Sequence, residues 1–192
     1  MGDIKKNVLE SIEELNLNQE IELSDIPKLD LYMDQVITLF ETSLSGTKRS
    51  EEDKLLTKTM INNYTKDKIL MPIKNKKYSR NHIIMMIFLY NLKQILSIND
   101  IKLLLNKIVV NSKEEENMKL DSLYQVFLNI KKADEVSLKE EIENKVNSIL
   151  KESEKLDRSD DYEKLLLVVL TLINNANMQR RTAEKIIDKY FK

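Results

Sequence analysis

The sequence predicts an all-α fold with one short β-wing, and three observations lead to this prediction. Leu, Ile, Lys, Glu and Asn dominate the 192 residues, which is a composition typical of helices. Apolar residues recur at helical spacing along most of the chain. Only two glycines and two prolines are present, and hairpins, barrels, sandwiches and phosphate-binding loops depend on glycine.

Composition also limits the class and the compartment of the protein. Hydrophobic residues make up 42% of the chain, too many for a disordered protein and enough for a core. The absence of cysteine excludes disulfides and thiolate metal sites and favours a cytoplasmic location. The N-terminus lacks the apolar segment of a signal peptide, and the longest uncharged apolar run, Ile83–Tyr90, is far shorter than the roughly 20 residues of a membrane span. We therefore expect no membrane association.

The first half of the chain predicts five helices and a wing. A helix over 3–15 is followed by a connector over 16–27, and Asp30 is the expected N-cap of a helix that ends near Ser43. Thr57 is the expected cap of a short helix to Lys66, with Ile61 and Tyr64 facing inward and Met60 beside them. The basic segment Ile73–Tyr78 resembles a small β-wing. Ser79 begins a core helix that includes Ile95 and ends near Leu96, and Ser97 with Asp100 caps the next.

The second half predicts four more helices, at about 115–132, 137–155, 161–175 and 179–191. Ser137, Ser159 and Asn177 stand at the expected starts of the last three. The expected inward-facing residues are Leu120, Leu123, Phe127 and Leu128, then Leu138, Ile142, Val146 and Ile149, then Leu165, Leu166, Val169 and Leu172, and finally Ile186, Ile187 and Tyr190.

Charge is distributed unevenly along the chain. Residues 1–47 carry three Lys and ten Asp or Glu, for a net charge of −7, whereas residues 48–107 carry a net charge of +8 and residues 108–192 one of −2. Within the basic middle, residues 57–80 hold seven Lys or Arg and one acid. A basic segment of this kind is typical of a surface that binds phosphates.

One stretch resembles the DNA-binding domain of the MerR family of transcription regulators. The resemblance rests on the segments 56–64, 68–72, 78–79 and 96–104. The family has a recognition helix with a Tyr-Tyr pair, a Gly-Leu-Leu-x-Pro segment, a wing closed by Tyr, and a Ser-Leu-x-Glu-Ile-Lys-x-Leu-Leu element. In this sequence Thr57 corresponds to the helix cap, Tyr64 to the second Tyr, and Tyr78 to the wing Tyr. Ile69, Leu70 and Pro72 match the segment before the wing, and Ser97, Ile98, Ile101 and Lys102 match the last element. The resemblance implies a winged helix-turn-helix.

The sequence departs from that family at the positions that contact bases. Thr59 and Asn62 stand where the family has two arginines, and Asn63 stands where it has the first Tyr. Lys68 replaces the glycine, and residues 45–55 form an inserted loop. The whole chain is also similar to a bacterial family named domain of unknown function 1836, through Ile26–Pro27, Tyr32–Gln35 and Leu56–Lys66. That family is described as one of candidate regulators.

These residues suggest specific contacts with double-stranded DNA. Asn62 and Asn63 offer the amide groups that pair with adenine, and Thr59 offers a methyl group for thymine. Lys58, Lys66, Lys74, Lys76 and Lys77 would meet phosphates, and the amides near Thr57 would bind another. The first hypothesis is therefore a DNA-binding transcription regulator that acts as a homodimer, because two-fold sites need two protomers. A small-molecule effector is a further partner left open.

Three regions are expected from this interpretation: an N-terminal helix and connector over 1–28, the MerR-like element over 29–108, and a C-terminal helical region over 109–192 for dimerisation or interaction. The alternative function is a helical protein-interaction module that has lost DNA binding, and the missing arginines motivate it. We predict no enzymatic activity and no cofactor or metal site, because His82 is the lone histidine and no nucleophile or glycine-rich loop accompanies it.

Overall fold

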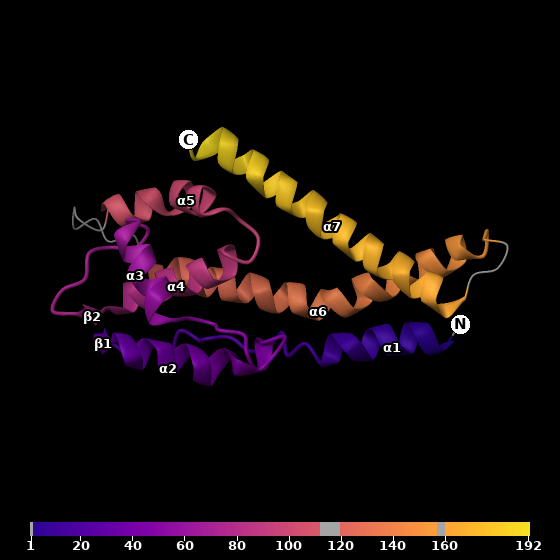
Figure 1. The fold of residues 1–192 in the computed structure, drawn as a ribbon, viewed down its shortest axis with the longest axis horizontal. Helices are drawn as coiled ribbons and strands as arrows, with labels where there is room; N and C mark the ends of the chain where they lie inside the picture. Colours follow the sequence, from indigo (N-terminus) through magenta and orange to yellow (C-terminus); the bar gives the residue numbers. More distant parts are fainter. Residues whose placement is uncertain (1, 112–119, 157–159) are drawn as a thin grey trace. The chain divides into compact units, whose positions relative to one another are not determined.

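The computed structural model describes residues 2–111, 120–156 and 160–192, and it is mostly helical with one small sheet (Figure 1). This confirms the expected helical class. The elements in chain order are α1 (Gly2–Glu13), β1 (Leu31–Tyr32), α2 (Met33–Leu44), η1 (Ser45–Thr47), α3 (Lys58–Lys66), β2 (Lys77–Tyr78), α4 (Arg80–Leu92), α5 (Ile98–Asn111), α6 (Leu120–Ser153) and α7 (Asp161–Tyr190). Within the described ranges, no helix combines the length and the apolar character that crossing a membrane requires.

The chain divides into two compact units. Unit 2 comprises Gln19–Asn129 and Ala183–Lys192, and unit 1 comprises Met1–Asn18 and Ile130–Thr182. The long helices α6 and α7 each contribute to both units. The expected region boundaries after residues 28 and 108 both lie inside unit 2, and the functional division of the chain stays a prediction.

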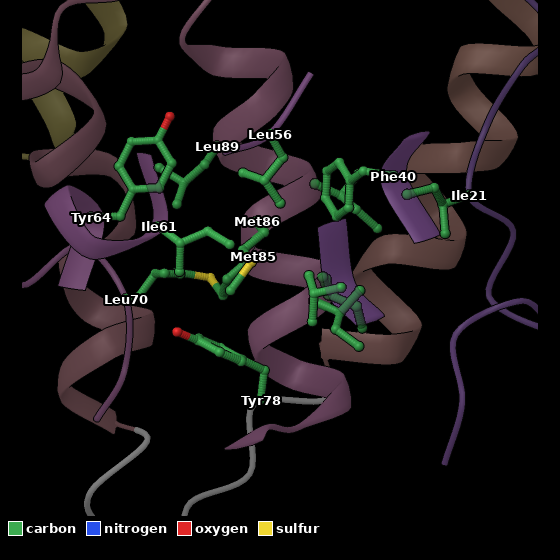
Figure 2. Packing of buried hydrophobic residues seen from close by; sticks show 14 of the residues in the cluster. Ile21, Phe40, Leu56, Ile61, Tyr64, Leu70, Tyr78, Met85, Met86 and Leu89 are labelled. Atoms are coloured by element: carbon green, nitrogen blue, oxygen red, sulfur yellow. The ribbon is translucent and has the colours of Figure 1, made fainter. Parts of the chain in front are cut away.

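Unit 2 is built around α4, which is buried on almost every side. Ile83, Ile84, Met85 and Met86 are fully enclosed, and Phe40 of α2 and Ile61 of α3 pack in the same cluster (Figure 2). A helix that is apolar all round is stable only when other elements cover it. The expected central place of this helix is confirmed, and α2 and α3 are the elements that it holds in position.

The connector before β1 is tied to this core by hydrogen bonds from the side chains of Arg80 and Tyr124. The Arg80 guanidinium donates to the Leu23 carbonyl at 2.6 Å and also to the Ile26 carbonyl, and it pairs with Asp121 at 3.0 Å. The Tyr124 hydroxyl donates to the Ile21 carbonyl at 2.5 Å. Burial is the main reason that the pKa of Tyr124 is raised. These bonds satisfy connector carbonyls that would otherwise be buried without partners.

Two expected boundaries in the first half were wrong. Asp30 does not cap a helix, because Leu31 and Tyr32 form β1 and α2 begins at Met33 with Tyr32 as its N-cap residue. The Tyr32 N–H donates to the Gln35 side chain at 2.8 Å, which replaces the cap expected from Asp30. Helix α4 ends at Leu92 rather than near Leu96. As a result Ile95, expected in the core, lies in a turn and is 59% exposed.

The second half forms two long helices where four were expected. Helix α6 continues through Ser137, whose hydroxyl donates to the Asp134 carbonyl one turn earlier instead of capping a new helix. Helix α7 likewise continues through Asn177. Neither expected break contains a glycine or a proline, so nothing in the backbone stops the helix. Ser159 and the expected helix start near residue 115 lie outside the described residues.

Several expected inward-facing residues in this half point outward. Leu123, Leu165, Leu166, Val169, Ile186 and Tyr190 are exposed. The core of unit 1 consists of Ile4, Val146, Leu150 and Val168, with Val8, Ile142, Ile149 and Leu172 packed against it. Of the residues expected to face inward, Ile142, Val146, Ile149 and Leu172 are confirmed. Helix α7 carries apolar residues on more than one side, so sequence spacing alone did not identify the side that α6 covers.

Candidate nucleic-acid interface

Helix α3 begins and packs as the sequence predicted. The Thr57 hydroxyl accepts a hydrogen bond from the Met60 N–H at 3.1 Å, which is the N-cap that threonine is suited to provide. Ile61 and Tyr64 are buried in the same cluster as Met85, Met86 and Leu89 of α4, and Figure 2 shows Ile61 beside the two methionines. Burial raises the pKa of Tyr64. These contacts fix which side of α3 faces outward.

The outward side of α3 is polar throughout. Thr59, Asn62, Asn63 and Lys66 are exposed and follow one another at intervals of three, one and three residues, which places them on one face of the helix. Lys58 is exposed at the first turn, and Thr57 is half-buried. The face therefore combines a hydroxyl, two amides and two ammonium groups, a set that can both donate to and accept from a ligand.

The C-terminus of α3 contains a strained residue. The Ile69 N–H donates to the Tyr64 carbonyl at 2.9 Å and the Lys68 N–H to the Thr65 carbonyl at 3.1 Å, which together form a Schellman motif. Lys68 occupies the left-handed position of that motif, with φ of 58°. Glycine is the usual residue there because it has no Cβ to strain the backbone. The lysine keeps a positive charge at the end of the helix at the cost of that strain.

Replacing Lys68 with glycine is expected to stabilise the protein by about 1 kcal/mol, since the left-handed conformation costs side-chain-bearing residues roughly that much. For a chain of this size the midpoint of thermal unfolding should rise by about 2–4 °C. Lys68→Ala is the matched control, because alanine retains the Cβ and removes only the amine. Equal midpoints for the glycine and alanine variants would contradict the assigned strain.

A tight basic turn lies between α3 and α4. The Lys77 N–H donates to the Lys74 carbonyl at 2.9 Å, and the two central residues, Asn75 and Lys76, have φ of 52° and 57°. Positive φ at both central positions is the signature of a type I′ turn. Lys74, Asn75 and Lys76 are exposed, and Lys77 is half-buried. The segment expected to be a wing is therefore a four-residue turn that carries three lysines.

The strand that follows this turn pairs with the segment before α2, and its first residue, Lys77, also forms an isolated antiparallel bridge with Lys74 at the entry of the turn. In the antiparallel pair β1–β2, Leu31 lies opposite Tyr78 and Tyr32 lies opposite Lys77. Tyr78 is buried and closes the core below Ile61, as expected of the Tyr at the end of the wing (Figure 2). The pairing fixes the end of the basic turn beside the start of α2.

Two of the predicted site lysines meet at the N-terminal end of α2. The Lys58 ammonium lies 2.8 Å from a carboxylate oxygen of Asp34. The Lys77 ammonium lies over the ring of Tyr32, 5.0 Å from its centre, in a cation–π contact. Asp34 and the Tyr32 ring are both well exposed. Neither partner was predictable from the sequence, because Asp34 and Lys58 are 24 positions apart, Tyr32 and Lys77 are 45 positions apart, and no short-range pattern links them.

The remaining predicted site residues have distinct places. Asn62, Asn63 and Lys66 lie farther along α3 than Lys58, and Lys74 and Lys76 lie on the turn. Arg80 does not belong to this set, because its guanidinium donates to a connector carbonyl and pairs with Asp121. All nine predicted residues belong to unit 2, and every one of them retains at least part of its surface in solvent.

His82 forms hydrogen bonds on both sides of the basic turn in the sequence. Its Nδ1 accepts from the Ser79 N–H at 3.2 Å, which caps α4, and its Nε2 lies 3.3 Å from the Met71 carbonyl. An Nδ1 that accepts and an Nε2–H that donates describe a neutral ring. Burial is the main reason that the pKa of His82 is lowered from its ordinary value of 6.5. The lone histidine therefore links the segment before the basic turn to the helix after it.

His82 should titrate below pH 6.5, and acid should destabilise the fold through it. The unfolded chain binds this proton near pH 6.5 and the folded chain does so only at lower pH, so stability present above pH 6.5 is lost as the pH falls below it. Because the sequence has one histidine, a single imidazole resonance in proton NMR reports the pKa directly. A midpoint at or above 6.5 would contradict the buried neutral ring.

The region just described is a small helical unit with a polar helix face and an adjacent basic turn. The model of the family described as a domain of unknown function, DUF1836, matches residues 21–127, which is more than half of the chain. The protein belongs to that family, as the sequence resemblance predicted. The matched segment lies within the Gln19–Asn129 part of unit 2, and the unit also includes the last ten residues of the chain. No curated protein and no solved structure matches the chain.

Proposed function

We propose that the protein is a DNA-binding transcription regulator that docks α3 against a duplex. The observation that carries this proposal is the outward face of α3, where Thr59, Asn62, Asn63 and Lys66 are exposed while Ile61 and Tyr64 anchor the opposite side. An α-helix fits the major groove of B-form DNA, and amide side chains there can pair bidentately with adenine.

The basic turn would supply contacts with the sugar-phosphate backbone. Lys74 and Lys76 project from a rigid type I′ turn, and Lys58 stands at the N-terminal end of α3 beside amides that can bind an anion. The order strand, helix, helix, turn, strand, helix supports the winged helix-turn-helix implied by the resemblance to the MerR family. Two protomers would read a two-fold site, and the proposed setting is the cytoplasm.

Asp34 gives this proposal a sharp test. Its carboxylate oxygen lies 2.8 Å from the Lys58 ammonium. A DNA phosphate that binds Lys58 must therefore compete with this ion pair and also approach the negative charge of Asp34. Asp34→Asn should therefore strengthen binding to duplex DNA, by roughly threefold to tenfold at low salt, whereas Lys58→Ala should weaken it by a similar factor. Fluorescence anisotropy with a labelled duplex measures both variants.

The same experiment distinguishes the alternative function. Glu41→Gln is the matched control. Glu41 lies on α2, as Asp34 does, and pairs with Lys48 at 2.6 Å, so removing its charge leaves the α3 surface intact. Opposite shifts for Asp34→Asn and Lys58→Ala, with no shift for the control, support the proposal. Absence of duplex binding by the wild type and by Asp34→Asn at low salt contradicts it and favours a protein-interaction module.

A further inference from the structure

One exposed aromatic side chain lies beside the proposed DNA surface. Tyr32, at the junction of β1 and α2, is 54% exposed. The other aromatic side chains that the structure describes between Gln19 and Asn129 are buried or half-buried, namely Phe40, Tyr64, Tyr78, Phe88, Tyr90, Tyr124 and Phe127. Tyr32 therefore adds little to the core, and its ring and hydroxyl are accessible to a ligand.

The backbone of Tyr32 is fixed on both sides. Strand β1 places Tyr32 opposite Lys77, and the Tyr32 N–H donates to the Gln35 side chain at 2.8 Å. Successive residues of a strand face opposite ways, so Leu31, which lies opposite the buried Tyr78, faces the core and Tyr32 faces away from it. A side chain presented by a fixed backbone loses less conformational entropy when it binds a ligand.

The neighbours of Tyr32 come from both parts of the proposed DNA surface. The Lys77 ammonium, at the end of the basic turn, lies 5.0 Å from the centre of the Tyr32 ring. Asp34, two residues after Tyr32, pairs with Lys58 of α3 at 2.8 Å. The basic turn and the N-terminal end of α3 are thus both in contact with the start of α2, which is where Tyr32 stands.

A tyrosine in this place has the chemistry to contact a DNA phosphate. Its O–H is a donor, phosphate oxygens are acceptors, and tyrosine is among the side chains that position proteins on the sugar-phosphate backbone. The ring holds the Lys77 ammonium close, so the hydroxyl and the ammonium can reach the same phosphate. A neutral donor adds affinity without releasing a counterion, which gives its contribution a signature different from that of a lysine.

We propose that Tyr32 is a DNA-backbone contact, whose hydroxyl donates to the phosphate that Lys77 also contacts. The inference rests on the proposed function, because it adds a residue of α2's N-terminal end to the surface formed by α3 and the basic turn. A contact at this point fixes the start of α2 on the sugar-phosphate backbone and thereby sets how α3 lies in the groove.

Fluorescence anisotropy with the full chain and a labelled mixed-sequence duplex tests the contact. Tyr32→Phe removes only the hydroxyl and should weaken binding by about fivefold. The slope of log affinity against log salt should stay unchanged, because no charge is lost. Tyr190→Phe is the matched control, since Tyr190 is 67% exposed and the Lys189 ammonium also lies 5.0 Å from its ring centre. The control should bind as the wild type does, and both variants should keep the wild-type midpoint of thermal unfolding.

The Lys77→Gln background tests the shared phosphate. There Tyr32→Phe should weaken binding by less than about twofold, because two groups that act on one phosphate are coupled. An equal loss in both backgrounds would overturn the shared phosphate, and a shallower salt slope in Tyr32→Phe would show that the substitution acts through a lysine instead. If Tyr32→Phe binds as tightly as the wild type while Lys58→Ala binds more weakly, the inference fails and the proposed function stands. No duplex binding by the wild type would contradict both.

Discussion

Replacing Lys74, Lys76 and Lys77 together with glutamine is expected to lower the affinity for duplex DNA by about 100-fold at 0.1 M salt. Each lysine that neutralises a phosphate releases a counterion, and at that salt concentration each such contact contributes nearly one power of ten to affinity. Lys77 should contribute least, because its ammonium is already held over the Tyr32 ring. Glutamine keeps the length of the side chain and removes only the charge.

The salt dependence separates this effect from damage to the fold. The slope of log affinity against log salt should become shallower by about two to three in the triple variant. Lys145 and Lys151 of α6, together with Lys155 in the turn after it, provide the matched control, since their replacement with glutamine changes the net charge equally in unit 1. An unchanged slope in the first variant, or an equal loss of affinity in the control, would refute the role of the basic turn.

Replacing Phe40 with alanine is expected to destabilise the protein by about 3–5 kcal/mol. Phe40 is fully buried on α2, and its ring meets Tyr90 of α4 edge to face with 6.3 Å between the ring centres. Truncation removes apolar surface that folding takes out of water, and it leaves a cavity between the two helices. Chemical denaturation followed by circular dichroism measures the loss, which corresponds to a midpoint lower by about 10 °C or more in thermal unfolding.

The control for this substitution is Ile95→Ala. Ile95 is a large apolar residue, but it lies exposed in the turn after α4, so its truncation should change stability by less than about 0.5 kcal/mol. Comparable losses at the two positions would show that α2 is not packed against α4 as described. Helix α2 also carries Asp34, which pairs with Lys58 of α3, and it follows β1, which pairs with the strand after the basic turn. A weaker contact between α2 and α4 should therefore make both α3 and the basic turn less firmly held.

Local chemistry explains which parts of the fold were predictable. Thr57 and Ser97 each stand before an apolar helical pattern, and both begin helices as expected, with the Ser97 hydroxyl accepting from the Asp100 N–H at 3.2 Å. The apolar character of α4 on all sides likewise predicted its central burial. Such features depend on residues within one or two turns of each other, so the sequence displays them directly.

The features that were missed depend on contacts between distant residues. The pairing of β1 with β2 overrides the cap expected from Asp30, and it joins residues 47 positions apart. On α7 both sides are apolar, so helical spacing could not tell which side α6 covers. The predicted site residues of α3 and of the turn lie at least partly in solvent, whereas Asp34 and Tyr32 carry no local signal of their contacts with Lys58 and Lys77.

Fluorescence anisotropy with a mixed-sequence duplex over a range of salt concentrations tests the claim that α3 and the basic turn bind duplex DNA. If about five phosphates are neutralised, log affinity should fall against log salt with a slope of roughly −4 to −5. Absence of binding at low salt, or binding that does not respond to salt, would contradict the claim.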